Sequence, residues 1–198
     1  MFDLQHFFCD FGYSVIPRGS NSAGEITTTF PEEWLNAYVA GNFHLQDPIF
    51  RLARTMHGRT RSKILTPDDM ASPLYEEAAP HNAASNVFIS TKLGGSQMIL
   101  GGVNDTMKPH HLAEATEAAK RAHRQVLLNK LDQLTDKQLD ILDLADEGCR
   151  DSELAYELGI SPSAVNQRKA AICRTLGIDS FQFASRLYAT RKWGNILV

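Results

Sequence analysis

Apolar and polar residues alternate over short stretches in the first half of the chain. Residues 13–17 and 25–30 are extended runs separated by a turn-rich stretch, a pattern that predicts a β-hairpin. Residues 86–91 and 97–103 are β-rich runs, and the five residues that join them contain two glycines. They predict a second hairpin, so this half of the chain contains a sheet.

Helical patterns surround these strands. Pro31 opens a helix with acidic residues in its first turn, and Trp34 and Tyr38 lie four positions apart on one face. Another helix follows Asp47 and Pro48. The pattern therefore predicts helices that flank a central sheet.

A longer helix is predicted over residues 109–131. Its apolar positions recur at alternating steps of three and four: Leu112, Ala115, Ala119, Ala122 and Val126. Small alanines allow two backbones to approach closely, so this stripe is suited to a helix–helix contact in a homodimer. The same stripe is equally suited to packing on the chain's own sheet, and the sequence leaves both interpretations open.

After residue 131 the start and stop signals of helices become regular. Thr135 and Gln138 form a capping box, and Leu139, Leu142 and Ala145 give a stripe that Gly148 ends. A second helix runs from about Asp151 to Gly159, carrying Leu154, Ala155 and Leu158, and a third begins with Ser161 and Pro162 and ends at Gly177. A fourth follows Ser180, with Phe181, Ala184 and Leu187 inward. These signals predict an all-α, four-helix domain over residues 131–198, after an α/β domain over residues 1–130.

Composition restricts the class of protein. The three cysteines, Cys9, Cys149 and Cys173, form no close pair, which argues against a disulfide framework and a zinc knuckle. No apolar run approaches the roughly 18 residues that span a bilayer, and the N-terminus lacks the order of a secretory signal. We expect a cytoplasmic protein with no membrane partner.

The charges are distributed unevenly in the last third of the chain. Residues 134–159 contain two basic and eight acidic residues, a net charge of −6. Residues 160–198 contain six basic residues and one acidic residue, a net charge of +5. A module polarised in this way orients its basic part toward a polyanion.

Enzyme chemistry has no support in the sequence. There is no nucleophile elbow, no glycine-rich phosphate loop and no metal-binding pattern of histidine and cysteine. His110 and His111 are adjacent, and therefore do not point to one metal ion from a regular helix; His44 and His123 are lone histidines of the surface or structural kind. We expect neither catalytic residues nor a cofactor or metal.

The second and third C-terminal helices, joined by a Gly-x-Ser turn, predict a helix-turn-helix whose second helix enters the DNA major groove. Asn166, Gln167, Arg168 and Lys169 lie opposite the buried stripe of that helix, and Ser163 lies in its first turn. Amide and guanidinium groups are suited to bidentate contacts with bases. We predict that these five residues contact double-stranded DNA.

Residues 134–178 strongly resemble the LuxR-type helix-turn-helix domain, in particular Ala145-Asp-Glu-Gly148, Glu153-Leu-Ala-Tyr-Glu-Leu-Gly-Ile-Ser161 and Cys173-Arg-Thr-Leu-Gly-Ile178. At the positions of that family's reading helix, Asn166 and Arg168 replace the usual lysine and histidine. The resemblance implies a transcription regulator that binds DNA as a homodimer, with RNA polymerase as a further partner. A different front domain, a phosphoacceptor receiver, is disfavoured because Asp68 and Asp69 lie in a loop-like stretch.

The spacing Trp34-x3-Tyr38-x8-Asp47-Pro48 resembles the signature of the acyl-homoserine-lactone-binding domains of quorum-sensing LuxR regulators. The resemblance implies an α/β/α sandwich. It also implies that the Trp34 indole contacts the lactone carbonyl, that Asp47 accepts the amide N–H and that the Tyr38 hydroxyl holds an acyl-chain carbonyl. Without this spacing, the residues read as a core-facing aromatic pair and a helix cap before Pro48.

The chain departs from that signature at three places. No tryptophan occurs in residues 56–65, where the family usually has a second one; Asn86 stands where a glycine is usual, and Gly101-Gly102 where a hydroxyl residue is usual. The expected ligand pocket is therefore degenerate. The alternative is a ligand-independent LuxR-type regulator, or an anti-activator that acts through dimerisation.

Overall fold

The structure is a computed structural model and describes residues 2–17, 19–20, 22–55 and 59–194. The chain divides into two compact units. Unit 1 contains Met1–Lys92 and Gln97–His123, and unit 2 contains Leu93–Ser96 and Arg124–Val198. No helix among the described residues has the length and apolar character needed to cross a membrane.

A five-stranded sheet with strand order β2-β1-β5-β4-β3 forms the middle of unit 1. Its strands are β1 (Asp10–Pro17), β2 (Ile26–Thr28), β3 (Arg61–Ile64), β4 (Val87–Leu93) and β5 (Ser96–Val103). β1 and β2 pair antiparallel with Gly12 opposite Thr28, which confirms the first predicted hairpin. β3 and β4 also pair antiparallel.

β4 and β5 form the second predicted hairpin. The two strands are joined by only Gly94 and Gly95, a shorter connection than the sequence pattern indicated. Both glycines have positive φ, 55° and 89°. Two-residue hairpin turns of the primed types require such angles, which glycine adopts without steric cost.

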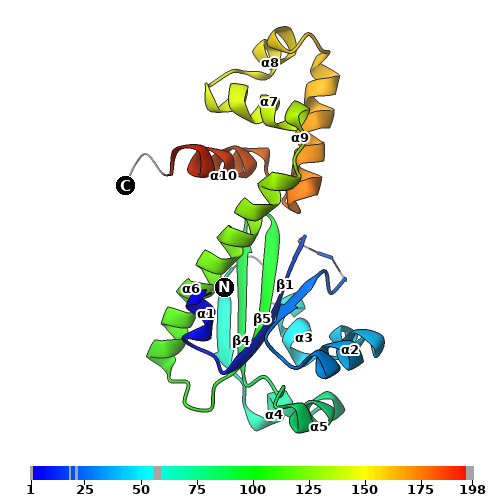
Figure 1. The fold of residues 1–198 in the computed structure, drawn as a ribbon, viewed down its shortest axis with the longest axis vertical. Coiled ribbons are helices and arrows are strands. Elements are labelled where there is room, and N and C mark those ends of the chain that lie inside the picture. The colour runs from blue at the N-terminus through cyan, green and yellow to red at the C-terminus, as the bar shows by residue number, and fades with distance from the viewer. Residues whose placement is uncertain (1, 18, 21, 56–58, 195–198) are drawn as a thin grey trace. The chain divides into compact units, whose positions relative to one another are not determined.

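Helices cover the sheet of unit 1, as Figure 1 shows, with α6 on one face and α2 and α3 on the other. The helical elements are α1 (Phe2–Gln5), α2 (Glu32–Ala40), η1 (Phe43–Leu45), α3 (Pro48–Thr55), α4 (Pro67–Met70), α5 (Pro73–Ala78), η2 (Ala79–His81) and α6 (Pro109–Asn129). On the α3 side, Ile49 and Phe50 form one apolar cluster with Phe88 and Ile99 of the sheet. The α/β/α sandwich expected from the sequence is present.

The apolar stripe of α6 is used inside the chain. Ala115 and Ala119 have 0% of their surface exposed, and the buried His123 contacts Thr91 of β4, with 2.8 Å between Nδ1 and Oγ1. His123 is therefore structural, as the sequence predicted. Packing within the chain is therefore confirmed for Ala115 and Ala119, whereas Leu112, Ala122 and Val126 of the stripe are half-buried, and the contact with a second copy stays a prediction.

Unit 2 is all-helical. After η3 (Lys130–Gln133) come α7 (Asp136–Asp146), α8 (Asp151–Glu157), α9 (Pro162–Leu176) and α10 (Phe181–Trp193). The side-chain oxygen of Gln138 accepts a hydrogen bond from the Thr135 N–H over 2.9 Å, and the Ser161 hydroxyl caps α9 by accepting from the Ala164 N–H over 3.2 Å. Gly148, Gly159 and Gly177 have positive φ at the helix ends. The four predicted helices are confirmed.

The inward face of α7 differs from the predicted stripe. Ile141 and Leu142 are fully buried, whereas Leu139 and Ala145 are half-buried. Adjacent Ile141 and Leu142 both face inward because α7 contacts α8, α9 and α10. The predicted stripe is wide enough for packing against one neighbouring helix, whereas α7 packs against three.

Candidate ligand cavity and candidate DNA-contacting helix

The cavity of unit 1 begins with the two aromatic residues of α2. Pro31 precedes this helix, Glu32 and Glu33 occupy its first turn, and Trp34 is its buried residue. Because four residues make about one helical turn, Tyr38 lies on the same face, and the two ring centroids are 5.9 Å apart. Sequence spacing alone thus accounts for their proximity.

Trp34 is held by aromatic contacts on other elements. Its ring is stacked with Phe43 of η1 and with His81 of η2, at centroid distances of 5.9 and 5.6 Å. Only 6% of Trp34 is exposed. Among the described residues, its indole N–H has no hydrogen-bond partner. The ring is therefore fixed while its polar edge stays available to a bound molecule.

Asp47 follows η1 and has two tasks. Its Oδ1 accepts a hydrogen bond from the Ile49 N–H over 2.7 Å, which caps the start of α3. Its Oδ2 accepts from the Tyr38 hydroxyl, also over 2.7 Å. The helix cap that the sequence offered as one interpretation of Asp47 is therefore present, and the contact of Asp47 with a ligand stays a prediction.

Burial dominates the electrostatics of this pair. Loss of solvation raises the pKa of the Asp47 carboxyl, against the lowering effect of the hydrogen bonds from Tyr38 and Ile49. Loss of solvation, and then the nearby Asp47 charge, raise the pKa of the Tyr38 hydroxyl. Tyr38 therefore stays protonated and its proton is committed to Asp47.

Trp34, Tyr38 and Asp47 line one cavity of about 80 Å³. Apolar side chains make up most of the remaining wall, among them Phe30, Ile49, Phe50, Leu74, Ala78 and Ile99. A few polar side chains in an apolar wall are typical of sites for small amphiphilic molecules. The three residues that the sequence spacing singled out therefore lie in the wall of one cavity.

Most other lining residues were not found from the sequence, among them Ser85 and Tyr75. Ser85 lies beside Gly101, where a Cβ would come within 2.9 Å of the Ser85 Oγ, so the serine hydroxyl fills space that a larger residue 101 would take. Tyr75 lines the cavity from α5. Pro73 and the buried pair Leu74 and Ala78, four positions apart, were the only local signal for this short helix.

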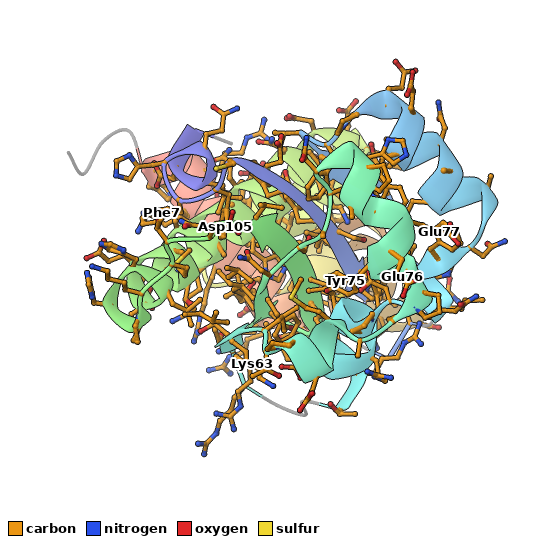
Figure 2. The ribbon with its side chains drawn as sticks, turned by 90° about the horizontal axis from the view of Figure 1, so that it is seen from below. Phe7, Lys63, Tyr75, Glu76, Glu77 and Asp105 are labelled. Carbon is orange, nitrogen blue, oxygen red and sulfur yellow. The ribbon has the colours of Figure 1, made fainter. Side chains whose placement is uncertain are left out.

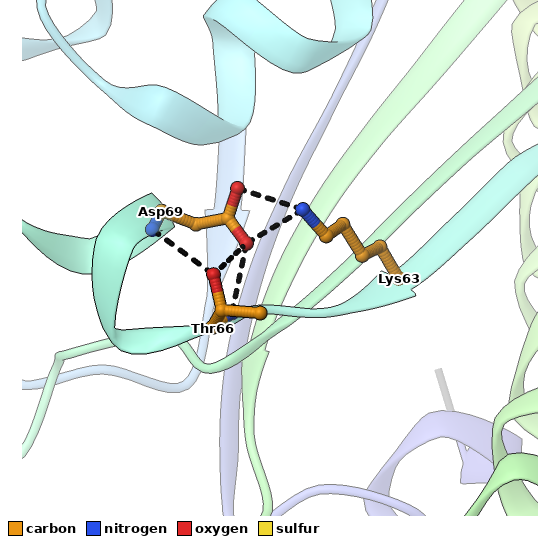
Figure 3. A network of polar contacts seen from close by, with 3 residues as sticks. All are labelled: Lys63, Thr66 and Asp69. Carbon is orange, nitrogen blue, oxygen red and sulfur yellow. Dashed lines mark hydrogen bonds and ion pairs between the residues drawn. The ribbon is translucent and has the colours of Figure 1, made fainter.

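A polar network fixes the segment before α5, as Figure 3 shows. The Asp69 carboxylate accepts from the Thr66 N–H over 2.8 Å and pairs with the Lys63 ammonium at 2.6 Å. Hydrogen bonds from Lys63 and Thr66 lower the pKa of the Asp69 carboxyl to about 2. Asp69 therefore completes the capping box of Thr66 at the start of α4, the short helix that precedes α5.

The candidate DNA-contacting residues lie on α9 of unit 2. Ser163, Asn166 and Gln167 are exposed, and Arg168 and Lys169 are half-buried. Lys169 is engaged within the unit, because its ammonium pairs with Asp151 at 2.5 Å and lies 4.6 Å from the Phe181 ring centroid. Ser163, Asn166, Gln167 and Arg168 have no such partner among the described residues.

The histidines singled out in the sequence as poor metal ligands, His44, His110 and His111, do not line the cavity. His110 and His111 are exposed on α6, with ring centroids 4.0 Å apart, and His44 lies edge-on to Phe50. Among the residues that the structure describes, no three histidine, cysteine or acidic side chains gather in a metal-binding group. Residues 56–58, part of the stretch without a second tryptophan, lie outside the described residues.

Comparisons with solved structures give remote likenesses. SdiA in complex with octanoyl-rac-glycerol is 18% identical with a TM-score of 0.49, over 95% of this chain and 84% of that chain. Escherichia coli SdiA in another crystal is 18% identical with a TM-score of 0.41, over 93% and 84%. The N-acylhomoserine lactone-dependent LuxR family factor CepR2 of Burkholderia cenocepacia is 19% identical with a TM-score of 0.44, over 59% and 76%. Among curated proteins, none matches the chain.

The family assignment rests on a different finding. The autoinducer-binding domain family matches residues 2–101. This match covers half of the 198-residue chain and contains the whole cavity wall described above. The chain therefore belongs to the autoinducer-binding domain family of LuxR-type quorum-sensing regulators, which are receptors for a small-molecule signal and not enzymes.

Proposed function

We propose that this protein is a cytoplasmic LuxR-type transcription regulator that binds an acyl-homoserine lactone, or a related signal, and double-stranded DNA. In this proposal residues 1–130 are the sensor and dimerisation domain, and residues 131–198 are the DNA-binding domain. The observation that carries it is the cavity of unit 1, where Trp34, Tyr38 and Asp47 meet in an otherwise apolar wall.

The polar groups of the cavity suit an acylated lactone. The Trp34 N–H is a donor for the lactone carbonyl. Each Asp47 oxygen accepts one hydrogen bond within the chain and has a further lone pair for the amide N–H. The apolar side chains around them suit an acyl chain. In the family the hydroxyl that corresponds to Tyr38 holds an acyl carbonyl; here its proton is directed to Asp47.

The DNA-binding part of the proposal is supported by charge and exposure. Residues 160–198 have a net charge of +5, and α9 presents exposed Ser163, Asn166 and Gln167 with Arg168 beside them. We assign base contacts to these side chains, and to Lys169 a contact made only if its pairing with Asp151 opens. Two half-sites require a homodimer, and transcription control adds RNA polymerase as a partner.

The cavity volume favours one alternative. Pockets for drug-sized ligands measure about 300–1,000 Å³, whereas this one has about 80 Å³. A bound acyl lactone would have to displace side chains of the wall. A ligand-independent regulator, or an anti-activator that acts through dimerisation, needs no such displacement.

Thermal unfolding with and without ligand separates the two functions. A ligand that binds only the folded protein raises the melting temperature increasingly with its concentration. We expect such a rise with at least one member of a panel of acyl-homoserine lactones of different chain length. DNA binding by the same preparation is measured in parallel on a selected site and on random DNA. Tight, selective DNA binding without a thermal shift from any lactone would favour the ligand-independent regulator.

A further inference from the structure

A buried polar atom of the cavity wall takes no part in the roles proposed for Trp34, Tyr38 and Asp47. The side-chain oxygen of Tyr75 is buried, and it has no hydrogen-bond partner among the described residues. It is the sole buried side-chain nitrogen or oxygen in that condition within the described part of the chain. Buried polar groups are paired in most folded proteins, so an unpaired one in a cavity wall calls for an explanation.

Packing explains the ring of Tyr75 and leaves the hydroxyl unexplained. The ring packs against the apolar cluster of Ile49, Phe50 and Phe88, while its neighbour Leu74 belongs to the cluster of Trp34. Phenylalanine would make the same apolar contacts without burying an unpaired hydroxyl, which is unfavourable. Packing of the ring therefore does not explain why residue 75 is a tyrosine and not a phenylalanine.

Figure 2 shows Tyr75 on the sheet side of α5 and Glu77 on its outer side. Glu76 and Glu77 are exposed, in agreement with this placement. The network of Lys63, Thr66 and Asp69 caps α4 directly before α5. Tyr75 therefore lies on a helix that directly follows this network, and it lines the cavity.

The hydroxyl is a donor under all ordinary conditions. Burial, followed by the charges of Asp47 and Asp69, raises the pKa of Tyr75. The proton of the neighbouring Tyr38 is already donated to Asp47. Tyr75 therefore supplies a lining hydroxyl that is buried and has no partner among the described residues, close enough to Asp47 to be influenced by its charge.

We propose that Tyr75 is a signal-binding residue of this protein, which donates a hydrogen bond to an oxygen of the acyl part of the bound signal. This inference rests on the proposed function of the cavity. It adds to Trp34 and Asp47 a third anchor, on a different helix, and it favours signals with an acceptor oxygen next to the amide group over purely hydrocarbon chains at that position.

The test compares Tyr75→Phe with wild type by isothermal titration calorimetry. The probes are N-octanoyl-homoserine lactone and N-(3-oxooctanoyl)-homoserine lactone, which differ by one oxygen on the acyl chain. Loss of one neutral hydrogen bond should weaken binding about 3- to 10-fold. A loss for both probes identifies the amide carbonyl as the acceptor, and a loss for the 3-oxo probe alone identifies the chain oxygen. The unliganded variant should unfold at the same temperature as wild type or higher.

A second substitution serves as the matched control. Tyr156→Phe removes the hydroxyl of a tyrosine that is 84% exposed on α8 and does not line the cavity. It should leave the affinity for both probes unchanged, and an equal loss in the two variants would overturn the specific role of Tyr75. Unchanged binding by Tyr75→Phe, in a protein whose wild type binds a probe, would overturn this inference alone. Absence of binding by wild type would overturn the proposed ligand, and this inference with it.

Discussion

The two units use their polar side chains in opposite ways. In unit 1 the polar groups of the candidate site are turned inward, where Asp47 and Tyr38 satisfy each other and the Tyr75 hydroxyl has no partner among the described residues. In unit 2 the candidate residues Asn166 and Gln167 are exposed on α9. An inward site suits a small molecule that gives up its water, and an exposed helix face suits a large, hydrated polyanion.

The difference has an energetic consequence. Substitutions at the inward site change both stability and binding, because the same side chains form the core and the cavity wall. Exposed substitutions on α9 change binding and leave stability within about 0.5 kcal/mol.

The two tryptophans give the largest expected difference. Trp34 is 6% exposed and stacked between other rings, so Trp34→Ala should lower the free energy of unfolding by about 3–5 kcal/mol. Trp193 of unit 2 is 44% exposed and donates one hydrogen bond to Asp146, so Trp193→Ala should cost much less. Urea unfolding followed by circular dichroism measures both. Equal losses would contradict the contrast between the two sites.

Asp47 separates ligand binding from capping. Asp47→Asn keeps a good N-cap but removes the charged acceptor, so lactone affinity should fall by about 1.5–3 kcal/mol, measured by calorimetry. Asp47→Ala removes the cap as well and should cost a further ~1 kcal/mol of stability. If Asp47→Asn bound lactone as tightly as wild type, the carboxylate would be a helix cap alone.

Arg168 tests the exposed helix. Arg168→Ala should weaken binding to the selected DNA site by about 1–3 kcal/mol more than binding to random DNA, as expected for a residue that contacts bases. Lys169→Met is the comparison: since its ammonium pairs with Asp151, we expect a small loss of stability and no loss of selectivity. Fluorescence anisotropy at fixed salt measures both. An equal loss on both DNAs for Arg168→Ala would assign Arg168 to phosphate contacts.

The smallest expected effect concerns acid. The pKa of Asp69 is lowered to about 2 from an ordinary 3.8, so its network with Lys63 and Thr66 contributes stability above pH 3.8 that is lost as the pH falls toward 2. Asp69→Asn should flatten this part of the pH dependence of the melting temperature. Asp47 works in the opposite direction, because its raised pKa makes stability fall as the pH rises through that pKa. If the melting temperature of Asp69→Asn fell in acid as much as that of wild type, the loss of stability in acid would come from other carboxyl groups.

Local signals account for what the sequence predicted. Thr135 with Gln138, Ser161 with Pro162, and the glycines that end helices act within a few residues, and they predicted the helices of unit 2. Trp34 and Tyr38 share one helix face, and Asp47 begins the next helix. These three site residues could therefore be found from spacing.

Contacts between distant segments account for what the sequence did not predict. Tyr75 and Ser85 reach the cavity only because α5 and the approach to β4 fold against the sheet, and no periodicity marks them. The partner of Lys169 lies 18 positions away on α8, so an apparently free basic residue of a reading helix proved to be paired. The stripe of α6 fitted two kinds of packing equally; the folded chain shows that Ala115 and Ala119 are buried within it, and the contact with a second copy stays a prediction.

The central claim, that the cavity of unit 1 binds the signal, can be tested through the fluorescence of Trp34, which lines the cavity. Trp193→Phe leaves Trp34 as the remaining tryptophan of the chain, so its fluorescence reports on the cavity. Titration with N-octanoyl-homoserine lactone and its 3-oxo form should change the Trp34 emission in a saturable way, and Asp47→Asn in the same background should shift the curve to higher concentration. An emission that stays constant over the whole titration with both lactones would contradict the account.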